Sequence, residues 1–287
     1  MNSMAERPPT FERGTLWSVI VERTARALDS GALVPIRTEV EVIEDEGVPF
    51  LVRVVSNLER KARAVQPPPD GKPPKNPFLP PYEEDLFVSY VSPAHACLLN
   101  KFNVFDHHAL LVTRAYEEQD ALLTPADFEA LLQCTAEVDA LSFYNGGRIA
   151  GASQPHKHLQ FVQVPLAEGG RRTPMDEAIV RGRLPFRHAL GPPLRDPAQA
   201  HLLYRGLLRE VGCDQAGVPY NLLATRDWTM VVPRTQESFD SISLNSLAFA
   251  GSLLVKNREQ LERVRSVGPM AILRSVTGTP AMRTRGG

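Results

Sequence analysis

A proline-rich run, QPPPDGKPPKNPFLPP, occupies residues 66–81. Because proline fixes φ and has no backbone N–H, this run cannot form a helix or a central β-strand. It must therefore lie outside the regular structure, as a linker or a functional loop, and we expect a loop wrapped over one lobe, anchored by Phe78 and Tyr82. Residues 50–55 before it and 85–91 after it are rich in β-branched residues and predict strands.

Helix and strand signals alternate in the rest of the chain. Thr124 is a predicted N-cap, Pro125 suits the first turn and Asp127 completes a capping box. Apolar residues at helical spacing continue this predicted helix to Leu141. The other predictions are strands at 109–113 and 156–164, an irregular segment at 166–199, a helix at 200–211, a hairpin at 220–225 and 228–232, and a final helix within 244–264. This mixture indicates an α+β fold with antiparallel pairing.

The charge balance argues against a dedicated nucleic-acid binder, because 32 Lys and Arg against 33 Asp and Glu give a formal charge of -1. No apolar run approaches the roughly 20 residues that span a bilayer, and the first residues contain no signal-peptide core. Cys97, Cys134 and Cys213 are far apart and form no C-x-x-C pair. We therefore expect a cytoplasmic protein, with no membrane or nucleic-acid partner, whose buried thiols are reduced.

The segment NGGRIAGASQP at residues 145–155, followed by His156, His158 and Gln160, carries the strongest chemical signal. In a strand, residues two apart share a face, so two imidazoles and an amide are displayed in a row while Lys157 faces the opposite side. Glycine, alanine and serine in the preceding loop allow backbone N–H groups to approach phosphate oxygens closely. The pattern predicts a site for a phosphate-containing substrate.

Two other interpretations of these residues stay open. One is a pair of strand histidines that face solvent. The other is a metal site, since two histidines on one strand face can bind zinc, but glutamine is a poor third ligand and the remaining histidines are remote in sequence. The loop has no Gly-Lys-Ser/Thr ending and is not a Walker A loop. We expect no protein-encoded metal site.

The run Y-N-G-G…G-A-S-Q-P-H-K-H-L-Q resembles the signature of the diadenosine tetraphosphate (Ap4A) phosphorylases, also called ATP adenylyltransferases. These belong to the histidine-triad superfamily, in the branch that includes galactose-1-phosphate uridylyltransferase. The resemblance is colinear over most of residues 30–260 and includes N-P-F-x-P-P at 76–81, L-L-N-K-F at 98–102, Y-N-L-L-A-T-R at 220–226, M-V-V-P-R at 230–234 and the segment 243–256.

The resemblance implies a histidine-triad-like antiparallel sheet with packed helices, arranged as two such halves in one chain. It implies a catalytic region at residues 1–199 and a C-terminal region at residues 200–287 that completes the same fold. It also implies the activity: phosphorolysis of Ap4A by inorganic phosphate to ADP and ATP, reversible, through a covalent adenylyl-histidine. No tightly bound cofactor is expected, although Mg²⁺ can accompany the polyphosphate.

In this family the central histidine is the nucleophile, which matches His158 here. Its other ring nitrogen must be fixed, and we expect a backbone carbonyl near His156 to do this, while His156 itself contacts the phosphate or leaving group. An amide at Gln160 can donate to a phosphoryl oxygen but cannot act as acid or base. That favours transfer to an acceptor over hydrolysis.

The resemblance also assigns substrate-binding residues. These are Lys61, Asn100, Lys101, Asn145, Gly151, Ala152, Ser153, Gln154, Asn245, Ser246, Leu247, Ser252 and Lys256. We expect His107 and His108 to be structural. The alternatives are a nucleotidyltransferase acting on nucleoside diphosphate sugars, a histidine-triad hydrolase and a non-catalytic dinucleotide-binding module, and the protein is expected to be a monomer or homodimer.

Overall fold

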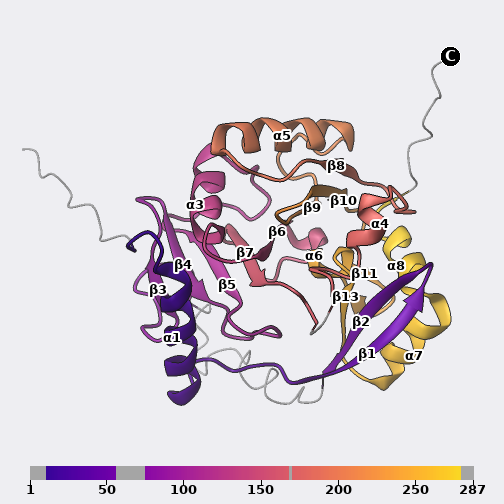
Figure 1. The fold of residues 1–287 in the computed structure, drawn as a ribbon, viewed down its shortest axis with the longest axis horizontal. Helices are drawn as coiled ribbons and strands as arrows, with labels where there is room; N and C mark the ends of the chain where they lie inside the picture. The colour runs from indigo at the N-terminus through magenta and orange to yellow at the C-terminus, as the bar shows by residue number, and fades with distance from the viewer. Residues whose placement is uncertain (1–10, 56–74, 168–169, 279–287) are drawn as a thin grey trace, which may run out of the picture.

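The computed structural model describes residues 11–55, 75–167 and 170–278. Its largest element is an eight-stranded sheet in which all neighbouring strands run antiparallel. In spatial order the strands are β3 (Phe87–Tyr90), β4 (His95–Leu99), β5 (Ala109–Thr113), β7 (His158–Gln163), β6 (Ala140–Gly146), β9 (Tyr220–Ala224), β10 (Thr229–Pro233) and β8 (Ala189–Gly191). Strands β6 and β7 lie in the middle of this sheet (Figure 1).

Helices cover one face of the large sheet. They are α1 (Leu16–Asp29), α3 (Pro125–Thr135) and α5 (Pro197–Glu210). Leu159 and Phe161 of β7 share a hydrophobic cluster with Phe128 of α3. Because side chains alternate along a strand, His158 and Gln160 belong to the opposite face.

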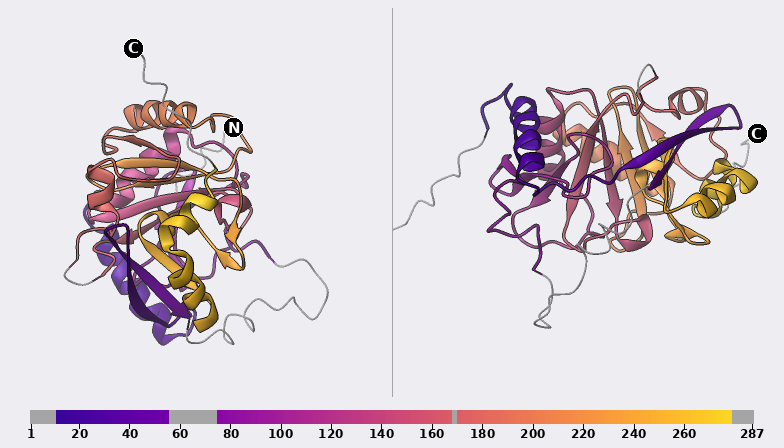
Figure 2. Two further views of the ribbon diagram at one scale, coloured as in Figure 1. Left: turned by 90° about the vertical axis from the view of Figure 1, so that its right-hand side faces the viewer. Right: turned by 90° about the horizontal axis from the view of Figure 1, so that it is seen from below.

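A second layer covers much of that opposite face. It consists of a three-stranded sheet, β1 (Thr38–Asp45), β2 (Val48–Val55) and β13 (Ser252–Val255), with α4 (Asp176–Val180), α6 (Ser246–Phe249), α7 (Arg258–Val267) and α8 (Pro269–Ser275). Strand β13 pairs in parallel with β2, so the C-terminal part of the chain folds onto an N-terminal hairpin. In the left view of Figure 2 the large sheet lies between α5 and this layer.

The site face of β7 lies between two apolar clusters. Val162 belongs to the cluster of the second layer. On the other side, Phe78 packs on residues of β4 and β5, among them Leu98 and Leu110. The end of the proline-rich run is therefore anchored by Phe78 as expected, whereas its residues 66–74 lie outside the described ranges. These two clusters position the start of β7 and the loop before it.

Most predicted elements are confirmed, including the strands around 50–55, 85–91 and 109–113, the 220–232 hairpin and the α+β class. The helix after Thr124 begins with the predicted capping box, in which Thr124 accepts from Asp127 N and donates its own N–H to Asp127. The thiols of Cys97, Cys134 and Cys213 are free and buried. The arrangement in two halves stays an interpretation of the resemblance.

Two predicted helices are present but have other bounds than expected. The helix after Thr124 ends at Thr135 rather than Leu141, and Ala140 and Leu141 belong to β6. A central strand that is buried on both faces is apolar throughout, so its sequence also satisfies helical spacing. Within 244–264, the structure has the short helix α6, strand β13 and then α7, which begins after its N-cap Asn257.

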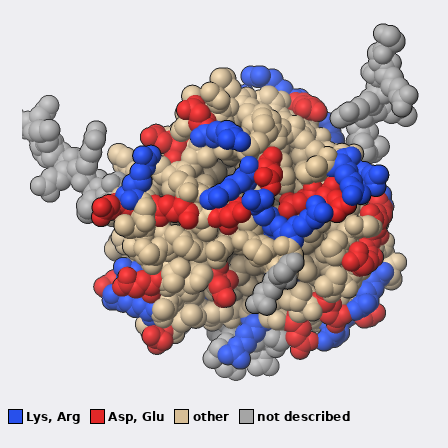
Figure 3. Space-filling view, in the orientation of Figure 1, with Lys and Arg blue, Asp and Glu red and all other residues tan. Residues whose placement is uncertain are grey.

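Acidic and basic side chains are interspersed over the face drawn in Figure 3 and form no patch of a single sign. This agrees with the formal charge of -1. Within the described ranges, no helix combines the length and the apolar character needed to cross a bilayer.

Candidate active site

His158 is held with one ring nitrogen free. Its Nδ1 donates to the carbonyl of His156 at 2.8 Å, so Nδ1 carries the proton and Nε2 carries the lone pair. Burial lowers the pKa of His158 to about 4, although the bond to the His156 carbonyl opposes this shift. The imidazole is therefore neutral at physiological pH, and the expected carbonyl near His156 is confirmed.

His156 contributes more than its carbonyl. Its Nε2 donates to the Thr113 carbonyl at 2.7 Å, and its Nδ1 accepts from Asn76 Nδ2 at 3.0 Å. The Phe78 ring lies against both imidazoles, with centroids 6.0 Å from His156 and 5.0 Å from His158. Both ring nitrogens of His156 thus have protein partners, and its contact with the phosphate or leaving group stays a prediction.

A relay of hydrogen bonds fixes the amide of Gln160. Asn100 Nδ2 donates to His108 Nδ1 at 3.2 Å, and His108 Nε2 then donates to Gln160 Oε1 at 3.0 Å. Burial lowers the pKa of His108 to about 4, which keeps it in this neutral form. Gln160 Nε2 is left as the free end of the amide, with two hydrogens to donate. His108 is therefore part of the site environment, which the sequence analysis did not anticipate.

The glycine loop closes against the segment before α6. Gly151 has φ +92, and a Cβ at this position would lie 2.5 Å from the Leu244 carbonyl oxygen and 2.8 Å from Asn245 Cβ. Only glycine allows this approach. The contact brings the predicted phosphate loop, Gly151 to Gln154, next to the predicted substrate segment that begins at Asn245.

The side-chain oxygen of Asn145 links β6 to β9 and to the start of α6. Asn145 Oδ1 accepts from Asn221 Nδ2 at 2.9 Å and from Ser246 N at 3.0 Å. Arg234 Nη1 donates to Asn221 Oδ1 at 2.8 Å and to the carbonyl oxygen of Leu244 at 3.0 Å. Sequence reasoning assigned no role to Asn221 or Arg234, although both lie in motifs that carry the resemblance.

Two family models together match nearly the whole chain. The model described as Ap4A phosphorylase N-terminal domain matches residues 6–181, and the model described as ATP adenylyltransferase C-terminal domain matches residues 182–279. The chain belongs to the Ap4A phosphorylase family. The models meet at residue 181, and the predicted division of the chain after residue 199 stays a prediction.

Individual members of the Ap4A phosphorylase family are similar over most of their length. Protein APA1 of Saccharomyces cerevisiae is 29% identical over 293 residues, which covers 86% of this chain and 88% of that protein. Diadenosine 5',5'''-P1,P4-tetraphosphate phosphorylase 2 of the same yeast is 30% identical over 232 residues, covering 66% and 71%. The crystal structure of yeast Ap4A phosphorylase Apa2 in complex with AMP shares the fold, with a TM-score of 0.78, 24% identity and coverage of 96% and 100%.

For the other predicted substrate residues of this Ap4A phosphorylase family member, the described part of the chain shows no contact with His158. Lys61 is outside the described ranges. Lys101 pairs with Glu83 at 2.8 Å on the surface, and Ser252 Oγ accepts from Arg53 Nε at 3.3 Å. The side chains of Leu247 and Lys256 have no described contact with His158. The roles of these residues stay predictions.

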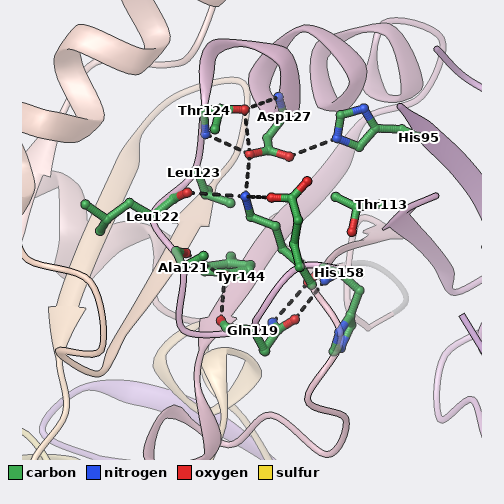
Figure 4. Close-up of polar contacts among 12 residues, drawn as sticks. His95, Thr113, Gln119, Ala121, Leu122, Leu123, Thr124, Asp127, Tyr144 and His158 are labelled. Atoms are coloured by element: carbon green, nitrogen blue, oxygen red, sulfur yellow. Dashed lines mark hydrogen bonds and ion pairs between the residues drawn. The ribbon is translucent and has the colours of Figure 1, made fainter. Parts of the chain in front are cut away.

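The side chain of Lys157, the residue before β7, is buried in an ionic cluster, on the side opposite His158 as the strand pattern predicted. Figure 4 shows His95 and Asp127 of this cluster beside the site. Lys157 Nζ donates to Glu117 at 2.9 Å and to Asp127 at 3.0 Å. Asp127 also binds His95 Nε2 at 2.8 Å. Burial alone would raise the pKa of Asp127, but the His95 hydrogen bond and the charge of Lys157 lower it to about 2. The cluster ties the start of β7 to the first turn of α3.

Replacing Gly151 with alanine is expected to destabilise the protein by about 2–4 kcal/mol and to reduce kcat/KM at least tenfold, because φ +92 is strained and the Leu244 carbonyl must move. Gly47→Ala is the matched control, since Gly47 has φ +79 but nothing within 4 Å of the new Cβ. Chemical unfolding and steady-state kinetics of both variants measure the difference. Equal losses in the two variants would show that the loop does not need this close contact.

Proposed function

We propose that this protein catalyses phosphorolysis of Ap4A by inorganic phosphate to ADP and ATP, with His158 as the covalent nucleophile. The observation that carries the proposal is the neutral His158 imidazole, held through Nδ1 with Nε2 free, on the same strand face as Gln160. Membership of the Ap4A phosphorylase family supports the choice of substrate.

The reaction proceeds in two displacements. His158 Nε2 attacks the α-phosphorus of Ap4A, the bond from that phosphorus to the bridging oxygen of the β-phosphate breaks, and ATP leaves. Phosphate oxygen then attacks the adenylyl phosphorus, the N–P bond breaks and ADP is released. Gln160 Nε2 and the backbone N–H groups of residues 151–154 stabilise the charge on the phosphoryl oxygens. Each step runs in reverse by the same groups.

The identity of the acceptor follows from Gln160. Its Oε1 accepts from His108, so only the amide nitrogen can face the substrate, and an amide cannot activate water as a base. Phosphate arrives already anionic and needs no base. This favours phosphorolysis over hydrolysis, with dinucleoside polyphosphates, ATP, ADP and phosphate as ligands. A cytoplasmic location belongs to the same proposal and is supported by the three free thiols.

Product analysis with Ap4A in the presence and absence of phosphate tests this function. We expect equimolar ATP and ADP only when phosphate is present, because without an acceptor each active site releases at most one ATP. Nucleoside diphosphate sugars serve as the comparison substrate. Cleavage of Ap4A at the same rate without phosphate would indicate a hydrolase, and turnover of the sugar nucleotide alone would indicate the alternative nucleotidyltransferase.

A further inference from the structure

The pairing of β6 with β7 stops short of the nucleophile. The last pair in the register joins Phe143 with Gln160, and the same register continued by two residues would place Asn145 opposite His158. Asn145 has no partner in this register with β7, but on the opposite edge of β6 it pairs with Asn221 of β9. The two central strands therefore separate where the phosphate loop leaves β6 and where His158 begins β7.

The side chain of Gln119 fills this separation (Figure 4). Its Oε1 accepts from His158 N at 2.7 Å, and its Nε2 donates to the carbonyl oxygens of Asn145 at 2.8 Å and His158 at 3.2 Å. The amide thus replaces the backbone partner that each strand lacks, and it is buried. One side chain holds both strands at a fixed spacing.

Gln119 is itself fixed through its backbone. Its N–H donates to the Pro155 carbonyl at 2.8 Å, and its carbonyl accepts from Tyr144 Oη at 2.5 Å. Gln119 therefore forms hydrogen bonds at both ends of residues 155–158, with the Pro155 carbonyl and with the His158 N–H. The His156 carbonyl, which lies within this segment, orients the His158 ring. A displacement of Gln119 would move the nucleophile and the carbonyl that orients it together.

We propose that Gln119 is a positioning residue for adenylyl transfer. The proposal rests on the proposed function, with His158 as nucleophile. Gln119 itself does not touch the substrate. It keeps β6 and β7 apart, so that the α-phosphate lies between the loop after Asn145 and His158 Nε2, and it fixes the peptide that carries the nucleophile. Placement errors of about 1 Å at a reacting atom can cost on the order of 100-fold in rate.

Two substitutions test this role, Gln119→Met and Gln119→Glu. Methionine removes every hydrogen bond of the amide, and kcat is expected to fall about 100-fold while KM for Ap4A changes less than about threefold. Glutamate keeps the acceptor for His158 N but faces two carbonyl oxygens, so only its protonated form can replace the amide. Burial and these oxygens raise the pKa of such a carboxyl, so the kcat of this variant relative to wild type is expected to rise as pH falls from 8 to 6.

A matched variant separates positioning from stability. Leu261→Ala removes a buried side chain of the second layer, and it is expected to lower stability while leaving kcat unchanged at temperatures where it is folded. Thermal unfolding identifies those temperatures for every variant. The role of Gln119 would be overturned if folded Gln119→Met had the same kcat as wild type. It would also be overturned if the kcat of Gln119→Glu relative to wild type did not change with pH.

A measurement without turnover keeps this inference separate from the proposed function. The ring ¹⁵N resonances of His158, assigned by their absence from His158→Ala, report its tautomer. We expect the Nδ1–H form in wild type and a mixture of tautomers in Gln119→Met. Unchanged resonances in this variant would contradict the proposal even if wild type proved inactive on Ap4A, whereas a missing phosphate-dependent reaction in wild type would contradict the function alone.

Discussion

Substitution of His158 by alanine is expected to lower kcat for Ap4A phosphorolysis at least about 10⁴-fold, because the covalent route loses its nucleophile. KM is expected to change only a few-fold, since Gln160, the loop at 151–154 and Asn145 remain. The side chain makes one described hydrogen bond, to the His156 carbonyl, so the variant should stay folded. Steady-state kinetics with a sensitive ATP assay measures the loss.

Trapping distinguishes a lost nucleophile from a disturbed site. Wild type incubated with Ap4A labelled at the α-phosphate, without phosphate, is expected to retain adenylyl label that is stable to base and labile to acid, as a phosphoramidate is. His158→Ala should retain none. His201→Ala, which changes a histidine of α5 outside the site, is the control and should behave as wild type. Phosphate-dependent ATP formation by His158→Ala at a normal rate would remove this residue from the mechanism.

The pH dependence follows from the same geometry. Burial lowers the pKa of His158 to about 4, and the imidazole is nucleophilic only when neutral. Its contribution to kcat is therefore complete above about pH 5 and is lost as pH falls through 4. An unperturbed histidine, with a pKa near 6.5, would already lose activity below pH 7.

Local signals were sufficient for much of the fold. The capping box at Thr124 and the alternating strands at 109–113 and 220–232 depend on neighbouring residues, and the structure confirms them. The sequence predicts helix for Ala140 and Leu141, the first residues of β6, because burial on both faces removes the alternation that identifies a strand. Strand β13 was missed because its partner, β2, lies some 200 residues away in sequence.

The candidate site likewise combines residues that local spacing predicts with residues that only the tertiary structure brings together. His158 and Gln160 are predicted from the sequence because their spacing is a local property of one strand. The residues that make this strand chemically specific, His108 and Gln119, come from other segments and carry no motif of their own. Hydrogen bonds between remote segments, such as His108 to Gln160, depend on tertiary packing and not on spacing. The sequence thus predicts the reacting group and, through the resemblance, the His156 carbonyl that orients it. The contacts of His108 and Gln119 are found only in the structure.

Removal of the Lys157 charge is expected to cost far more stability than removal of a charge from an exposed ion pair. Lys157→Met leaves Asp127 buried without its cation, and breaking one partner of a buried ion pair costs about 3–5 kcal/mol. Glu117 is half-exposed and can be solvated, so the penalty falls on Asp127. Urea unfolding measures the change in the free energy of unfolding.

Exposed pairs provide the comparison. Arg274 pairs with Glu46 at 2.7 Å with both side chains about two-fifths exposed, and Arg274→Met is expected to cost less than about 1 kcal/mol. The double variant Lys157→Met/Asp127→Asn removes both charges and should recover part of the loss, which a double-mutant cycle measures. Additive losses would show that the two groups do not interact.

Acid unfolding gives an independent check of the Lys157–Asp127 pair. The pKa of Asp127 is lowered from 3.8 to about 2 in the folded protein, so its ionised form contributes stability above about pH 4, and this contribution is lost as pH falls through 2. Without Lys157, the folded pKa of Asp127 rises, because burial is then opposed only by the hydrogen bonds from His95 and Thr124. Lys157→Met should therefore be less stable at pH 7 but lose less of its remaining stability between pH 4 and 2 than wild type. If the free energy of unfolding fell equally with pH in the two proteins between pH 4 and 2, Lys157 would not set the ionisation of Asp127.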